Sequence, residues 1–195
     1  MTLVAASQIL LWIAVLGLSL LVAALARQIG VLHERIAPAG ALTLHQKVNV
    51  GDKAAEMTLP ALGGEEVRVG GARGRSQLLL FVSPDCPVCK TLLPMLQSAS
   101  RAENRWLDTV LASDGGDEAA HRRLIMAHGL AGIPYVLSER LGRAFGVSKL
   151  PYAVLLDEEG RIASLGLVNN REHLESLFEA KERGVASIQQ YLARA

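Results

Sequence analysis

The residues of this chain best suited to do chemistry are its two cysteines, Cys86 and Cys89, in the segment Cys86-Pro87-Val88-Cys89. Two cysteines cannot form a disulfide framework, but at this spacing they can form one working pair. They follow an apolar run at 78–82 and begin a helical pattern. The free N–H groups of a first helical turn and the helix dipole would stabilise a thiolate at Cys86. We therefore expect Cys86 to attack a disulfide, and Cys89, one turn further and more buried, to resolve the mixed disulfide.

A metal site is the main alternative for two cysteines at this spacing. Zinc would need two more ligands, and no second cysteine pair or paired histidine motif is present. The histidines are scattered along the chain, at His33, His45, His121, His128 and His173. Two inert core cysteines are a further alternative, but a junction between a strand and a helix is a poor place to bury both. We therefore expect redox activity, no metal and no cofactor.

The elements that must position the cysteines alternate between strand and helix patterns. The run at 78–82 suits a strand buried on both faces, and 87–101 carries an apolar helical stripe. Further strands are expected at 67–69, 109–112, 152–156 and 161–165, and further helices at 117–128, 138–145 and 171–192. A turn at 157–160 would join two of these strands into a hairpin. This order predicts an α/β fold with a mixed central sheet and flanking helices.

The N-terminal segment is apolar without interruption. Residues 9–26 carry no charge, and at 1.5 Å per residue they would span about 27 Å, close to the thickness of a bilayer's hydrocarbon core. We expect a transmembrane anchor at 1–27, a juxtamembrane linker at 28–44 and one domain at 45–195, with the lipid bilayer as partner of 9–26. A buried core helix is disfavoured because the run has no polar face. A cleaved signal peptide is disfavoured because no Lys or Arg precedes the run, although Ala24-Leu25-Ala26 resembles a cleavage site.

Charge excludes one class of partner and complicates the topology. Lys and Arg number 20 and Asp and Glu 19, for a net charge of +1. This balance gives no electrostatic footprint for nucleic acid, so we expect no nucleic-acid partner. Arg27, Arg35 and Lys47 follow the apolar run, and on their own they would place the C-terminal domain in the cytoplasm.

Around the cysteines the chain resembles the thioredoxin superfamily. The segment 81–90 is similar to that superfamily's strand, active site and following lysine, and Pro94 stands where thioredoxins carry a helix-kinking proline. Leu150-Pro151 resembles the superfamily's cis-proline. The resemblance implies a thioredoxin-like fold and a cis Pro151 that faces the disulfide and presents backbone to a substrate chain. It also implies supporting active-site positions at Pro87, Val88, Lys90 and Leu150.

Over nearly its whole length the chain resembles the MauD family of methylamine utilization proteins. The resemblance rests on the N-terminal run, on residues 46–52 and on the stretch SPDCPVCKTLLP at 83–94. It implies a single-pass inner-membrane protein with its thioredoxin-like domain in the periplasm. It also implies disulfide formation, maturation or transport of the methylamine dehydrogenase small subunit, together with a membrane or periplasmic thiol–disulfide electron partner. Two alternatives stay open: a periplasmic disulfide reductase of the TlpA/ResA type serving cytochrome c or another client, and a non-catalytic escort of the dehydrogenase subunit.

Several positions depart from better-understood thioredoxin-like proteins. Leu80 stands where thioredoxins carry a buried aspartate that accepts a proton, and Asp85 stands where TlpA and ResA carry Trp. Val88 replaces the histidine of the strong oxidant DsbA, and Ser83 replaces the threonine that orients peroxide in peroxiredoxins. An acidic Asp85 should oppose the Cys86 thiolate. The direction of the redox reaction therefore stays open, with an expected reduction potential between those of thioredoxin and DsbA.

Overall fold

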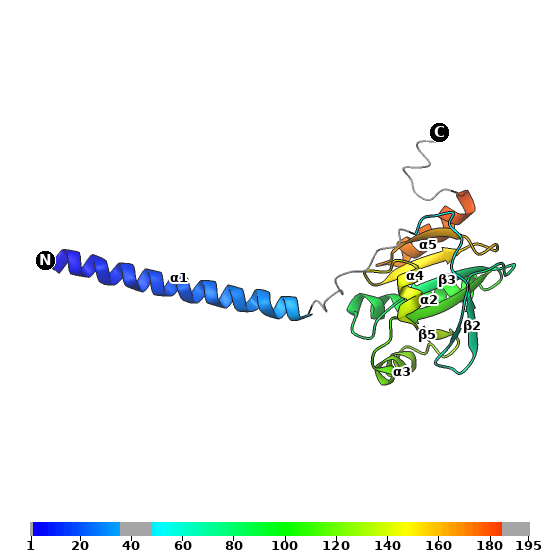
Figure 1. Ribbon diagram of the computed structural model, residues 1–195, viewed down its shortest axis with the longest axis horizontal. Coiled ribbons are helices and arrows are strands. Elements are labelled where there is room, and N and C mark those ends of the chain that lie inside the picture. Colours follow the sequence, from blue (N-terminus) through cyan, green and yellow to red (C-terminus); the bar gives the residue numbers. More distant parts are fainter. Residues whose placement is uncertain (1, 36–47, 185–195) are drawn as a thin grey trace. The chain divides into compact units, whose positions relative to one another are not determined.

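The N-terminal part of the chain is a single long helix. The computed structural model describes residues 2–35 and 48–184 (Figure 1). The chain divides into two units, Met1–Thr43 and Leu44–Ala195. In the first unit, α1 spans Thr2–Arg35 and so continues into the segment expected to be a linker. Residues 36–47, which include the expected boundary at 44–45, lie outside the described residues.

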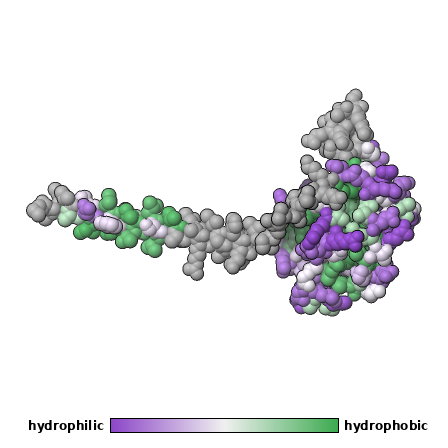
Figure 2. Space-filling model, viewed as in Figure 1, coloured by the Kyte–Doolittle hydropathy of each residue, from purple (hydrophilic) through white to green (hydrophobic). Residues whose placement is uncertain are grey.

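Leucine and alanine dominate α1, and both are strong helix formers. Its apolar side chains are exposed along 9–22, for example Leu10 at 71% and Leu20 at 73%, and Figure 2 shows this stretch largely in the hydrophobic colour. Over the residues it describes, the structure holds no helix that is long and apolar enough to cross a membrane. The transmembrane anchor expected at 1–27 is therefore not shown by the structure.

The second unit is built on a five-stranded sheet with the strand order β5-β4-β3-β6-β7. Its strands are β3 (Ser76–Phe81), β4 (Leu107–Ser113), β5 (Tyr135–Leu137), β6 (Tyr152–Leu156) and β7 (Ile162–Leu167). β3, β4 and β5 are parallel, whereas β6 and β7 are antiparallel to their neighbours. The mixed central sheet is confirmed. β3 is its middle strand and every residue of it is buried, as the continuous apolar run predicts.

Helices cover both faces of this sheet, as expected (Figure 1). They are α2 (Pro87–Ala102), α3 (Glu118–Ala127), α4 (Glu139–Ala144) and α5 (Arg171–Arg183). Leu78 and Leu80 of β3 pack in one apolar cluster with side chains of α2, α3 and α5. Leu79 and Phe81 point to the opposite face, because side chains alternate along a strand, and pack with α4. Burying one such leucine contributes about 1.5–3 kcal/mol, so β3 anchors both layers.

A short hairpin completes the second face. Its strands are β1 (Met57–Pro60) and β2 (Glu66–Val69), which pair antiparallel in a separate two-stranded sheet. Met57, Val67 and Val69 bury their side chains in the same cluster as Leu79 and Phe81. The sequence pattern indicated the second strand of this hairpin but not the first.

Two expectations about the elements need correction. The sequence reading has no strand between α3 and α4, yet β5 lies there, because three residues are too short for a recognisable alternation. The last helix was expected over 171–192; α5 ends at Arg183, and residues 185–192 of the expected range lie outside the described residues. Gly184 adopts a left-handed conformation with φ 60°, and its N–H bonds the carbonyls of Ala180 and Lys181. Glycine at this position ends a helix because it meets no Cβ penalty there.

Candidate active site

The loop after β3 places Cys86 at the N-terminus of α2. Cys86 is the N-cap residue, in extended conformation, and its Sγ accepts a hydrogen bond from the Cys89 N–H at 3.1 Å. The N–H of Cys86 donates to the Ser83 carbonyl at 3.2 Å, which holds the loop. Pro87 is the first helical residue, where a missing N–H costs no helical hydrogen bond. The junction of strand and helix expected around the cysteines is confirmed.

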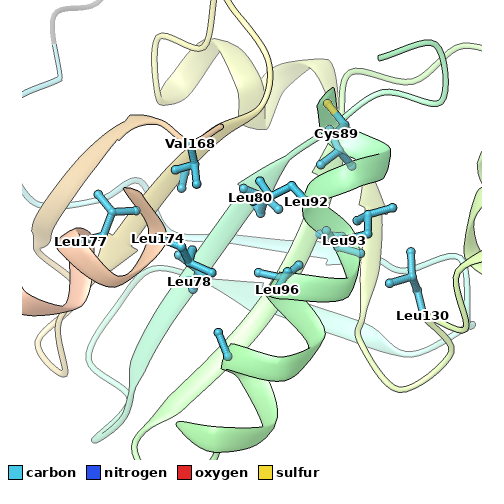
Figure 3. Packing of buried hydrophobic residues seen from close by; sticks show 14 of the residues in the cluster. Leu78, Leu80, Cys89, Leu92, Leu93, Leu96, Leu130, Val168, Leu174 and Leu177 are labelled. Atoms are coloured by element: carbon cyan, nitrogen blue, oxygen red, sulfur yellow. The ribbon is translucent and has the colours of Figure 1, made fainter. Parts of the chain in front are cut away.

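Cys86 and Cys89 form a disulfide with a Cα–Cα distance of 5.2 Å. The two sulfurs have different environments. Cys89 is 0% exposed within the apolar cluster under α2, whereas Cys86 is half-buried at its edge. Figure 3 shows Cys89 above Leu92 and Leu93 on the helix side facing the sheet. An incoming sulfur therefore reaches Cys86 more readily than Cys89.

The strand register brings Pro151 to the same edge of the sheet. Tyr152, the first residue of β6, pairs with Phe81, the last residue of β3. The Leu150–Pro151 peptide bond directly before it is cis, as the resemblance implies. Pro151 is buried, and its carbonyl accepts the N–H of Val168 at 3.1 Å. Among the hydrogen bonds of the described residues, none uses the backbone N–H or C=O of Leu150.

Exposed apolar side chains adjoin this backbone. Val88, between the cysteines, is 41% exposed, and Leu150 is 37% exposed. Lys90 and Asp85 are exposed charged residues on either side of the disulfide loop. Burial raises the pKa of Tyr152, the residue after Pro151, so its hydroxyl stays neutral at physiological pH.

Leu80, which stands where thioredoxins carry an aspartate, lies buried beneath the cysteines. It is 0% exposed and shares a cluster with Cys89. Figure 3 shows it on β3 beside Leu92 and below Cys89. The position that carries a proton acceptor in thioredoxins is thus filled here by a buried hydrocarbon side chain.

A buried polar cluster that was not predicted from the sequence lies between the loop after β4, helix α3 and the first residue of β5. His121 Nε2 lies 2.9 Å from the Gly115 carbonyl and Nδ1 lies 2.8 Å from the Tyr135 hydroxyl. Because a carbonyl only accepts, Nε2 carries a proton, and Nδ1 shares a hydrogen bond with the Tyr135 hydroxyl. Burial is the main cause that raises the pKa of Tyr135. The cluster links α3 to the loop after β4. In the sequence, the one feature that indicates it is His121, one turn after Asp117, which caps the helix.

Within the described ranges no group of three or more His, Cys, Asp or Glu side chains is placed to hold a metal ion. Of the five histidines, His33 and His45 lie in parts whose side chains the structure does not describe. His121 lies in α3, His128 is the C-cap of that helix and His173 lies in α5. Among the described residues, none of the three is bonded to either cysteine.

Comparison with known proteins first defines the class. Residues 50–186 match the AhpC/TSA family, and the chain belongs to this thioredoxin-like family. The thioredoxin domain of a thiol-disulfide oxidoreductase from Bacteroides vulgatus superposes with a TM-score of 0.60 at 18% identity, over 68% of this chain and 98% of that one. The fold, the family and the Cys86–Cys89 disulfide make the chain a thiol–disulfide oxidoreductase of the thioredoxin superfamily.

Within this class the sequence points to one group. The methylamine utilization protein MauD of Paracoccus denitrificans is 49% identical over 190 residues, covering 96% of this chain and 94% of the relative. The MauD of Methylorubrum extorquens is 48% identical over 189 residues, covering 96% and 91%. The chain belongs to the MauD family of methylamine utilization proteins.

Proposed function

We propose that this protein exchanges disulfides with the small subunit of methylamine dehydrogenase and so supports its maturation. The observation that carries the proposal is the Cys86–Cys89 disulfide at the N-terminus of α2, in a chain of the MauD family. The small subunit as client comes from the family resemblance. An electron partner in the membrane or periplasm would return the pair to its starting state.

The exchange runs through Cys86. When the pair is oxidised, a client thiolate attacks Cys86 Sγ, the bond to Cys89 breaks and Cys89 leaves as a thiolate that takes up a proton. A second client thiolate then attacks the first client sulfur in the mixed disulfide and releases Cys86 as a thiolate. The client loses two electrons and the pair gains two. The same steps in reverse reduce or isomerise a client disulfide, with Cys86 attacking and Cys89 resolving.

The client chain is held by backbone beside Pro151. Pro151 has no N–H and its carbonyl is already bonded to Val168, so the pairing groups available are those of Leu150. Leu150 thus presents its backbone to the client beside Pro151. The exposed side chains of Val88 and Leu150 would contact apolar residues next to the client's cysteine. Pro87 starts the helix, and Lys90 adds a positive charge in its first turn.

We also propose that α1 attaches the domain to the inner membrane through residues 9–26, with residues 45–195 on the periplasmic side. The support is the uncharged run and the exposed apolar side chains along it. The positive charges after the run argue for the opposite orientation. Alkaline phosphatase fused after residue 45 decides between them, because it folds to an active enzyme only where disulfides form. High phosphatase activity supports the periplasmic domain, and an inactive fusion overturns it.

The function is tested by trapping its intermediate. Cys89→Ala removes the resolving sulfur, so a client captured by Cys86 stays covalently bound. In cells grown on methylamine, we expect the tagged variant to carry the dehydrogenase small subunit in a reductant-sensitive adduct. A Cys86→Ala/Cys89→Ala variant is the matched control and should carry none. A purely non-covalent complex in both variants would favour the escort, and an adduct with cytochrome c biogenesis proteins alone would favour the TlpA/ResA-type reductase.

A further inference from the structure

The surroundings of Cys89 bear on how fast the mixed disulfide resolves. To attack, the Cys89 thiol must first lose its proton, because the thiolate is the nucleophile. Cys89 is 0% exposed, and its cluster neighbours Leu80, Leu92 and Val168 are hydrocarbon side chains (Figure 3). An apolar environment disfavours the charged thiolate. Deprotonation of Cys89 therefore needs an acceptor that the cluster itself does not contain.

The polar groups nearby do not supply one. Among the described residues the buried polar side chains include no carboxylate, and His121 is the one buried imidazole. Its Nε2 donates to the Gly115 carbonyl and its Nδ1 is hydrogen-bonded to the Tyr135 hydroxyl, so both ring nitrogens already have partners. The buried Tyr135 hydroxyl is hydrogen-bonded to that same histidine. The titratable groups near the cysteines, Asp85, Lys90, Lys149 and Tyr152, are half-buried or exposed, and so are Asp108 of β4, His128 and the charged side chains of α2, α3 and α5. In the described part of the chain, no hydrogen bond joins any of them to Cys89.

We propose that no neighbouring side chain takes the Cys89 proton and that hydroxide reaches the buried thiol only when the site opens, so that resolution is slow and is governed by hydroxide concentration. The inference rests on the proposed function and deepens it. In the mixed disulfide, hydroxide removes the Cys89 proton as water, the thiolate attacks Cys86 Sγ, and the client sulfur leaves with the electron pair of the broken bond. Slow resolution keeps the client covalently attached long enough for a second client cysteine to compete, which favours disulfide formation or isomerisation over simple reduction.

The test follows two phases of one reaction. The reduced full chain, kept soluble in mild detergent, is mixed with the aromatic disulfide DTNB. Attack by Cys86 releases one coloured thiolate, and attack by Cys89 on the resulting mixed disulfide releases a second. We expect the second rate to rise about tenfold per pH unit between about pH 6 and pH 8, because the thiolate fraction grows in proportion to hydroxide below the thiol's pKa. A second rate independent of pH would reveal an internal acceptor and overturn the proposal.

A pair of variants at Leu80 checks the cause. Leu80→Asp places a carboxylate beneath Cys89, and we expect it to speed the second phase at about pH 7 tenfold or more and to flatten the pH profile. Leu80→Asn has a similar shape but accepts no proton at these pH values, so the steep profile should remain. A folded Leu80→Asp that resolves no faster than Leu80→Asn contradicts the proposal. If the aspartate variant does not fold, the pH dependence of the second phase in the unmodified protein tests the proposal on its own.

The two phases distinguish a failure of this inference from a failure of the proposed function. A missing first phase means that Cys86 is not the nucleophile, and then the proposed function fails as well. A normal first phase followed by a pH-independent second phase leaves the function standing and removes only the inference.

Discussion

At the scale of single residues, two opposing electrostatic effects act on the Cys86 sulfur, one from the helix N-terminus and one from Asp85. The N-terminus of α2 directs free N–H groups toward its sulfur, and the Cys89 N–H lies 3.1 Å from it. Asp85 precedes it in the chain and is exposed. The helix N-terminus favours a thiolate at Cys86, and the carboxylate disfavours it.

Asp85→Asn should make Cys86 more reactive. Removing an exposed charge of this kind is worth about 0.2–1 kcal/mol, or about 1.5- to 5-fold in rate at constant pH. The measurement is the rate at which neutral iodoacetamide alkylates the reduced chain, with mass spectrometry to locate the label. Lys90→Gln removes a charge of opposite sign nearby and should slow the reaction or leave it unchanged. A slower reaction in Asp85→Asn would show that its carboxylate does not oppose the thiolate.

At the scale of elements, the sequence was most informative where a pattern is long. The buried strand at 78–82 and the helix from 87 could be predicted, because five consecutive apolar residues and a helical stripe each identify an element. β1 and β5 could not, because β1 ends in a proline, which is uncommon inside strands, and β5 is three apolar residues without any alternation. The clustering of His121 with Tyr135 likewise follows from strand order, which the sequence does not state.

The turn between β6 and β7 depends on a glycine without a side chain. Gly160 has φ 76°, and a Cβ there would lie 2.6 Å from the carbonyl oxygen of Gly71. Gly160→Ala should lower the free energy of unfolding by about 2–4 kcal/mol, because both the conformation and the immovable backbone oppose it. Gly74→Ala is the matched control, since Gly74 has φ 70° but no atom near its Cβ position. It should lose only about 1–2 kcal/mol. Equal losses in urea unfolding would contradict the steric part of the argument.

An ion pair joins α5 to the same turn. Lys181 Nζ lies 2.6 Å from Glu158 Oε1, and the Ser76 hydroxyl donates to the same oxygen at 3.0 Å. The bond from Lys181 is the main cause that lowers the pKa of Glu158 from its ordinary 4.5. A lowered pKa in the folded state means that the stabilisation is fully present above the unfolded value and is lost as pH falls through the folded one.

Glu158→Gln should therefore destabilise the protein more at neutral pH than in acid. The carboxylate is partly exposed, so the loss at about pH 7 is at most about 1 kcal/mol, and it should be smaller at about pH 3. Urea unfolding at both pH values measures it, with Glu159→Gln, an exposed neighbour, as control. A difference that persists unchanged in acid would show that the charge of Glu158 is not its source.

At the scale of the whole molecule, the two units of the chain differ in how their apolar side chains are placed. The unit Leu44–Ala195 contains both cysteines and both apolar clusters, whereas α1 exposes apolar side chains along 9–22. From composition and the apolar run the sequence predicts an anchor, a linker and one domain, and the domain boundary at 44–45 lies outside the described residues. For the site, the sequence predicts Cys86, Cys89 and Pro151. It does not predict the availability of the Leu150 backbone, because that depends on the bond between Pro151 and Val168.

Deleting residues 2–43 should release the protein from the membrane fraction without changing the domain. We expect the shortened chain in the soluble fraction, with its disulfide formed and its reaction with DTNB unchanged within about twofold, because the site lies wholly in the second unit. Cell fractionation and thiol titration measure both. A shortened chain that stays with membranes would show that α1 is not the attachment.

The most direct test of the central claim, that Cys86 and Cys89 form a working redox couple, is the reduction potential of the full chain. The chain is equilibrated in glutathione buffers of graded potential, and its free thiols are counted after acid quenching. The account predicts one reversible two-electron couple between about −270 mV, as in thioredoxin, and about −120 mV, as in DsbA. The absence of any reversible couple would contradict it and would leave the domain as a binding module for its client.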